Sequence, residues 1–121
     1  EMIYYIDAMD LCFKKDYKHA IPLFIKALDD TDNLEYVKYA VYNVAVSFMN
    51  LEDYTQAISF LTMYLKRWTG DSMLYFNLAY CYTCLDDNKK ALLNYNAAWV
   101  NNVNDNKCKG VIDFLLSKLD K

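Results

Sequence analysis

The chain has 121 residues, of which 55% are hydrophobic and 24% are charged, and its formal net charge is −3. This length supports one domain whose core needs neither disulfides nor a metal ion, and the hydrophobic content excludes an intrinsically disordered chain. The mild negative charge argues against nucleic acid and anionic membranes as main partners.

Glycine and proline are scarce, with two glycines and one proline in the whole chain. A protein of many β-strands needs these residues for its turns, so the sequence predicts an all-α fold. No signal peptide, membrane-spanning stretch or lipidation motif is recognisable, which predicts a cytoplasmic protein. Because the first residue is Glu1 and not Met, the sequence is also compatible with a fragment of a longer protein.

Apolar periodicity predicts a succession of helices along the whole chain. In chain order they cover residues 2–14, 16–28, about 34–50, 53–65, 72–85, 87–99 and 106–119. Two pairs of residues predict capping boxes at helix starts, Asp53 with Gln56 and Asp32 with Glu35. Gly70 predicts a helix stop and Asp71 the N-cap of the next helix. Pro22 lies about one turn into its helix and predicts a local irregularity there.

Three of these segments repeat one pattern: DYKHAIPLFIKAL (16–28), DYTQAISFLTMYL (53–65) and DNKKALLNYNAAW (87–99). Each begins with aspartate and has alanine at its fifth position, and these alanines (Ala20, Ala57 and Ala91) are 37 and 34 residues apart. A second helical stretch precedes each segment. Helix–turn–helix units of about 34 residues are the period of the tetratricopeptide repeat.

The chain resembles the tetratricopeptide repeat (TPR) family over residues 1–105. The third repeat matches the family pattern at Tyr75, Leu78, Ala79, Tyr82, Ala91, Tyr95 and Ala98. The other repeats depart from it at Asp7, where the pattern has leucine, and at Tyr64, where it has a small residue. Asp7 is therefore the one carboxylate expected on a packing face.

This resemblance implies an all-α, TPR-type α-solenoid, a right-handed superhelix of antiparallel helix pairs. The expected repeats are about 1–34, 35–71 and 72–105, followed by a C-terminal capping helix at 106–121. An apolar stripe on that last helix, Val111, Ile112, Leu115, Leu116 and Leu119, is expected to cover the open side of the third repeat. A helix that binds a partner is the alternative.

The stretch SMLYFNLAYCYTCL (72–85) carries no charge, and it has two apolar faces when drawn as a helix. One face packs within its own helix pair. The other lies on the side that lines a concave peptide-binding surface in TPR proteins. Equivalent positions in all three repeats are uncharged, and from them we predict peptide contacts at Tyr5, Met9, Tyr39, Tyr42, Asn43, Val46, Met73, Phe76, Asn77 and Tyr80. Met2 and Ile6 extend this surface.

Methionine and tyrosine suit an adaptable groove for apolar side chains, and the amides of Asn43 and Asn77 offer a donor and an acceptor to a peptide backbone. TPR domains that clamp a chaperone's C-terminal carboxylate use lysines and an arginine where this chain has Tyr5, Met73 and Asn77. Without cations such a clamp has nothing to hold the charge, so we reject that partner. Burial of the surface inside the fold, or by self-association, is the competing interpretation.

Catalytic and metal-binding chemistry is not evident. Cys81-x-x-Cys84 lacks a second cysteine pair or a nearby histidine, so we expect Cys12, Cys81, Cys84 and Cys108 to be buried free thiols. His19 is expected to be a solvated turn residue. We therefore expect no enzyme, no cofactor and no metal.

The predicted function is a protein–protein interaction module, scaffold or chaperone-like, that binds an apolar peptide or a short amphipathic segment. The alternative is a structural segment of a longer repeat array or a homodimerisation module.

Overall fold

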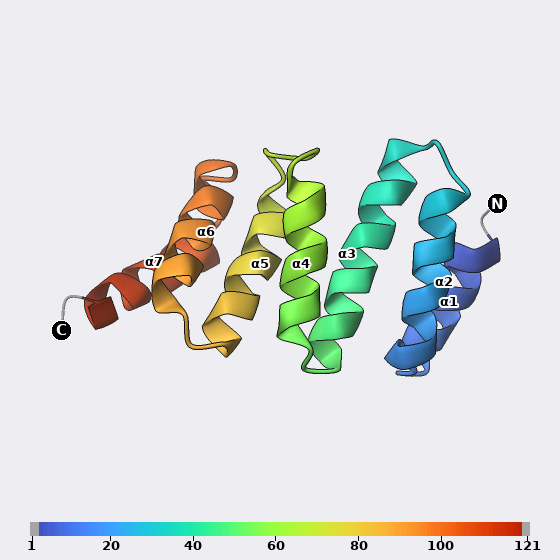
Figure 1. The fold of residues 1–121 in the computed structure, drawn as a ribbon. Helices are drawn as coiled ribbons and strands as arrows, with labels where there is room; N and C mark the ends of the chain where they lie inside the picture. Colours follow the sequence, from blue (N-terminus) through green and yellow to red (C-terminus); the bar gives the residue numbers. More distant parts are fainter. Residues whose placement is uncertain (1–2, 120–121) are drawn as a thin grey trace. The chain divides into compact units, whose positions relative to one another are not determined.

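The structure is a computed structural model that describes residues 3–119. In this part of the chain it contains seven α-helices and no strand (Figure 1): α1 (Ile3–Phe13), α2 (Tyr17–Asp29), α3 (Leu34–Asn50), α4 (Tyr54–Leu65), α5 (Ser72–Cys84), α6 (Asn88–Val100) and α7 (Asn106–Leu119). This confirms the all-α prediction. The contacts divide the chain into two compact units, residues 1–61 (unit 1) and residues 62–121 (unit 2), with the division inside α4.

Unit 1 is built on the close approach of α1 and α2. Ala8 on α1 and Ala20 on α2 are completely buried, and their small side chains let the two helices pack tightly. Phe24 fills the space beside them and is completely buried as well. Val44 on α3 joins the same cluster, so α3 packs on the α1–α2 pair.

Unit 2 repeats this construction with α5 and α6. Ala79 and Ala91 are completely buried where the two helices meet, and Tyr95 fills the space beside them. Helix α7 adds Cys108 and Leu115 to this cluster, and the Cys108 thiol donates to the Tyr95 carbonyl oxygen at 3.2 Å. Of the apolar stripe predicted on α7, Val111, Ile112 and Leu115 pack here, whereas Leu116 and Leu119 are exposed, which corrects that part of the prediction.

Aspartates begin most of the helices. The carboxylates of Asp16, Asp53, Asp71, Asp87 and Asp105 each accept a hydrogen bond from the backbone N–H three residues later. Such caps satisfy N–H groups that have no partner within the first turn of a helix. The predicted N-cap at Asp71 is confirmed. At Asp53 the carboxylate caps the helix as predicted, but the capping box with Gln56 is not formed, because the Asp53 N–H donates to the Phe48 carbonyl oxygen at 2.9 Å.

Two of the predicted boundary signals are wrong. Helix α3 is capped by Asn33, whose Oδ1 accepts from the Glu35 N–H at 3.0 Å, and not by Asp32. Both residue types cap helices, and the path of the preceding loop selects Asn33. Helix α4 ends at Leu65, before Gly70, and no glycine in the described chain has a positive φ. Gly70 therefore does not terminate that helix.

The turns within helix pairs reverse without glycine. Lys15, Glu52 and Asp86 adopt the left-handed conformation, with φ of 63°, 58° and 64°. Each follows the first helix of a pair and precedes the aspartate that caps the second. The irregularity expected at Pro22 is not seen in the secondary structure, since α2 is helical from Tyr17 to Asp29 with Pro22 inside it.

Asp7 is exposed, which corrects the prediction that it lies on a packing face. The equivalent residue of the second repeat, Val44, is completely buried because it packs against the α1–α2 pair that precedes it. In the described chain no helix precedes α1, so the matching side of α1 is open to solvent. The carboxylate therefore stays hydrated.

Among residues 3–119 we find no helix with the length and apolar character required to cross a membrane.

Candidate functional site

Three contacts join α1 and α3 side by side in unit 1. The Asn43 Nδ2 donates to the Tyr5 hydroxyl at 3.3 Å, and the rings of Tyr5 and Tyr36 lie 6.3 Å apart. Further along the same two helices, the Cys12 sulfur lies 3.5 Å from the Ser47 hydroxyl oxygen. These contacts bring the predicted residues of the first two repeats together on two adjacent helices.

Helix α1 carries a continuous strip of exposed apolar side chains. Ile3, Ile6, Met9 and Phe13 recur at intervals of three or four residues, and Phe13 is 90% exposed. On α3, Tyr36 and Tyr39 are exposed, whereas Tyr42, Asn43 and Val46 are half-buried. We call the uncharged surface formed by Ile6, Met9, Phe13, Tyr39, Asn43 and Val46 the α1–α3 face. Met2 lies outside the described residues.

Two of the predicted contact residues are packed against their own helix pair. The Tyr5 ring meets the Phe24 ring edge-on with centroids 5.7 Å apart, and the Phe76 ring meets Tyr95 in the same way at 5.2 Å. Tyr5 and Phe76 hold equivalent positions in their repeats, so this contact is a feature of the repeat. Both side chains are half-buried, so only part of each ring is accessible to a partner.

The two asparagines differ in what they leave free. Asn43 Nδ2 donates to the Tyr39 carbonyl oxygen at 2.8 Å as well as to the Tyr5 hydroxyl, which uses both of its hydrogens. Asn77 Nδ2 donates to the Met73 carbonyl oxygen at 3.0 Å. Asn77 therefore keeps one N–H and its carbonyl oxygen for a ligand, while Asn43 keeps its carbonyl oxygen.

In unit 2 the predicted residues of α5 form a second uncharged strip. Met73 and Tyr80 are exposed and Asn77 is half-buried between them. Cys84 follows Tyr80 by one turn and is also exposed. The hydrogen bond between these two side chains raises the pKa of the Tyr80 hydroxyl.

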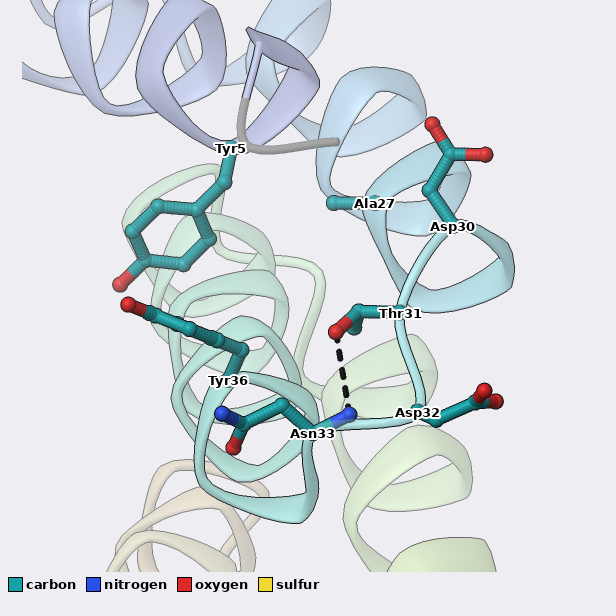
Figure 2. A pocket seen from close by; sticks show the side chains of 7 residues that line it. All are labelled: Tyr5, Ala27, Asp30, Thr31, Asp32, Asn33 and Tyr36. Carbon is teal, nitrogen blue, oxygen red and sulfur yellow. Dashed lines mark hydrogen bonds between the residues drawn. The ribbon is translucent and has the colours of Figure 1, made fainter.

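A pocket of about 280 Å³ lies beside Tyr5 in unit 1 (Figure 2). It is lined by Tyr5, Ala27, Asp30, Thr31, Asp32, Asn33 and Tyr36. Burial raises the pKa of the Tyr5 hydroxyl.

An additional helical turn builds one wall of this pocket. Helix α3 begins at Leu34, seven residues before Val41, whereas α5 begins at Ser72, three residues before the equivalent Tyr75. Tyr36 belongs to this extra turn, which has no counterpart in the third repeat. Sequence comparison between repeats could not find Tyr36 for that reason. Phe13 was missed as well, although continuing the α1 stripe one turn past Met9 would have included it.

All four cysteines are free, as predicted, but they are not all buried. Cys81 and Cys108 are completely buried, Cys12 is half-buried and Cys84 is exposed. Cys84 lies at the last residue of α5, on the side that no neighbouring helix of unit 2 covers, which corrects its predicted burial. Burial and the neighbouring Cys84 raise the pKa of the Cys81 thiol to about 12.

We expect iodoacetamide at pH 8 to alkylate Cys84 about a thousandfold faster than Cys81, because thiolate is the reacting species and Cys81 is both hidden and protonated. Peptide mass spectrometry of the native chain over time measures both rates. Cys84→Ser should abolish the fast phase and leave the slow one. Equal rates at the two positions in the folded chain would contradict the structure of α5.

His19, the single histidine of the chain, lies at the start of α2 beside the aspartate that caps it. His19 is exposed, as predicted, and its Nδ1 lies 2.9 Å from the Asp16 carboxylate, which lowers the pKa of Asp16. In the described part of the chain, no group of three or more histidine, cysteine, aspartate or glutamate side chains could hold a metal ion.

No protein-family model and no curated protein sequence matches the chain. Solved structures do match it over nearly its whole length. MamA 41-end from Desulfovibrio magneticus RS-1 matches with a TM-score of 0.80 and 20% identity. The match covers 97% of the present chain and 64% of the MamA chain. The first TPR of Spaghetti (RPAP3), bound to the HSP90 peptide SRMEEVD, matches with a TM-score of 0.84 and 15% identity over 99% of this chain and 93% of its own.

The TPR2AB domain of yeast Sti1, solved as a pHSP90 complex, matches with a TM-score of 0.72 and 15% identity, over 98% of this chain and 45% of its own. At such identities the likeness concerns the fold and not the ligand. The paired helices of this chain, with buried alanines between them and aromatic residues packed beside the alanines, agree with that fold. The chain therefore has the tetratricopeptide-repeat fold.

Proposed function

We propose that the chain is a protein–protein interaction module that holds a segment of a partner on the α1–α3 face. The observation that carries this proposal is the row of exposed, uncharged side chains along two adjacent helices, among them Ile6, Met9, Phe13 and Tyr39. Single exposed apolar residues are ordinary on a protein surface, but a contiguous apolar patch is typical of an interaction site.

The structural neighbours support a peptide as the ligand. The first TPR of Spaghetti was solved with the HSP90 peptide SRMEEVD and the Sti1 domain as a pHSP90 complex, so the same fold binds a peptide in a structural neighbour. The ligand proposed here differs in chemistry, because the α1–α3 face carries no cation for an acidic peptide. Apolar side chains of the partner would pack on methionine, phenylalanine and tyrosine, with the free amide groups of the asparagines available to its backbone.

The same composition on α5 makes Met73, Asn77 and Tyr80 a second contact strip in unit 2. Tyr5, Tyr42 and Phe76 would contribute the exposed parts of their rings.

We also propose three repeats, at about 1–34, 35–71 and 72–105, and no catalytic activity for the chain. Four free thiols fit a reducing compartment such as the cytoplasm.

A synthetic peptide of ten residues, alternating leucine or phenylalanine with serine, tests the proposal by isothermal titration. An extended chain of this sequence presents all its apolar side chains on one side. We expect the double variant Met9→Ser, Phe13→Ser to bind at least about tenfold more weakly, because the two lost apolar contacts together contribute about 1.5 kcal/mol or more. Both side chains are exposed, so the variant should fold as the native chain does.

The matched control is Ile25→Ser, which removes an exposed apolar side chain from α2, away from the α1–α3 face. It should leave the affinity unchanged. The peptide SRMEEVD should show no binding to the native chain. Equal affinity of the native chain and the double variant for the apolar peptide would overturn the proposal.

A second candidate function is assembly, and one observation in unit 2 favours it. Helices α6 and α7 expose large apolar side chains that lie outside the proposed contact strip: Leu93, Val100, Phe114 and Leu116. Such a surface suits the next unit of a longer array or a second copy of the chain. Sedimentation across concentrations separates the two functions, since a stable dimer that Phe114→Ser dissolves would favour assembly.

A further inference from the structure

We propose that the pocket between Tyr5 and the α2–α3 loop accepts a cationic side chain, arginine or lysine, of the segment bound on the α1–α3 face. This inference deepens the proposed function and rests on it for the identity of the segment. The pocket itself is a separate feature, because the extra turn of α3 forms it and no residue of the α1–α3 face lines it.

Two aromatic rings form one side of the pocket. The rings of Tyr5 and Tyr36 lie 6.3 Å apart at an angle of 59°, and both line the cavity (Figure 2). The negative face of a tyrosine ring attracts an ammonium or guanidinium group within about 6 Å of its centre. A guanidinium is flat and weakly hydrated, so it stacks on such a ring more readily than an ammonium.

The opposite rim is acidic. Residues 29–35, DDTDNLE, contain four carboxylates and no basic residue, and all four carboxylates are exposed. Figure 2 shows the Asp30 and Asp32 carboxylates directed away from the two tyrosines, at the rim of the pocket. Their charge would draw a cation to the opening, and the rings would hold it.

The loop that carries these carboxylates is ordered by its own hydrogen bonds. The Asn33 N–H donates to the Thr31 hydroxyl at 3.1 Å, and the Asn33 Oδ1 accepts from Glu35. The negative end of α2 and the positive end of α3 meet here and offset each other, so the carboxylates set the local sign. A pocket ordered before binding loses little conformational entropy when a side chain enters it.

The nearest basic side chain of α2 has another partner. The Lys26 Nζ lies over the Tyr4 ring, 5.6 Å from its centre, and Tyr4 does not line the pocket. The same pairing of a cation with a tyrosine ring is therefore already present in this unit. It occurs beside the pocket and leaves the pocket's own rings available.

The test is an NMR titration of the isotope-labelled chain with N-acetyl-arginine-methylamide, with its uncharged citrulline analogue as the matched probe. We expect arginine to shift the amide signals of Thr31, Asn33 and Tyr36, and citrulline to shift none of them. The lysine analogue should act as arginine does, with smaller shifts. Because the rim acts through charge, binding of arginine should weaken markedly in 1 M salt.

Two matched variants locate the contact. Tyr36→Leu keeps an apolar side chain but removes the ring, and should weaken arginine binding about tenfold. Tyr39→Leu changes the same residue type one turn along α3, outside the pocket, and should leave it unchanged. Asp30→Asn with Asp32→Asn should weaken it about threefold. Equal shifts with citrulline, or full arginine binding by Tyr36→Leu, would overturn the proposal.

The uncharged apolar peptide used for the α1–α3 face separates the two proposals. If that peptide binds and arginine does not, the pocket assignment is wrong and the interaction face stands. If arginine binds the pocket and the peptide fails, the pocket stands and the proposed interaction face is wrong.

Discussion

Replacing Phe24 with alanine will lower the free energy of unfolding by about 3–5 kcal/mol. The side chain is completely buried among Ala8, Ala20 and Val44, and its ring meets Tyr5 edge-on. Its removal leaves a cavity between α1 and α2 that neighbouring alanines are too small to fill. Urea unfolding followed by far-ultraviolet circular dichroism measures the change.

The adjacent Ile25 is the control, because it is exposed on the outer side of the same helix. Ile25→Ala should change the free energy of unfolding by less than about 0.5 kcal/mol. A similar loss of stability for both variants would mean that helix propensity, and not the packing of Phe24, decides the stability of α2. That result would contradict the described core of unit 1.

Enlarging an alanine in unit 2 should also be severe. We expect Ala79→Leu to destabilise the chain by about 2–3 kcal/mol, since the added atoms have no space between α5 and α6. Ala79 and Ala91 are both completely buried in this cluster. Leucine forms helices almost as well as alanine, so the loss would report packing and not helix propensity.

Asn96→Leu provides the comparison on α6, because Asn96 is exposed. It should change the stability little, although the leucine side chain is larger and more apolar than that of asparagine. The chain should tolerate leucine at position 96 and not at position 79. Equal tolerance at both positions would show that α5 and α6 are not held in close contact by their alanines.

The fold could be predicted from the sequence because its main determinants are local and repeated. Alanines where helices meet and aromatic residues beside them recur with the repeat, and aspartates mark the helix starts. Asp7 departed from expectation because burial at its position depends on a preceding helix pair, which sequence alignment of repeats does not consider. The α3 cap was misplaced because Asp32 and Asn33 are both capping residues, and only the loop geometry distinguishes them.

The candidate site could be predicted only in part. The exposed strip along α1 and α3 follows from helical spacing, so Met9 and Tyr39 could be predicted from the sequence. The edge-on packing of Tyr5 and Phe76 was not, because it depends on a ring in the second helix of each pair. The pocket could not be predicted either, since Tyr36 lies in an additional turn that the repeat pattern does not describe.

Photo-crosslinking gives the most direct test that α1 and α3 receive a partner segment. The uncharged apolar peptide would carry benzophenone at a central apolar position, and mass spectrometry would identify the linked residues. The account predicts crosslinks to Met9, Phe13 and Tyr39, which the unlabelled peptide suppresses. Crosslinks confined to α2 or α7, or none that the unlabelled peptide suppresses, would contradict it.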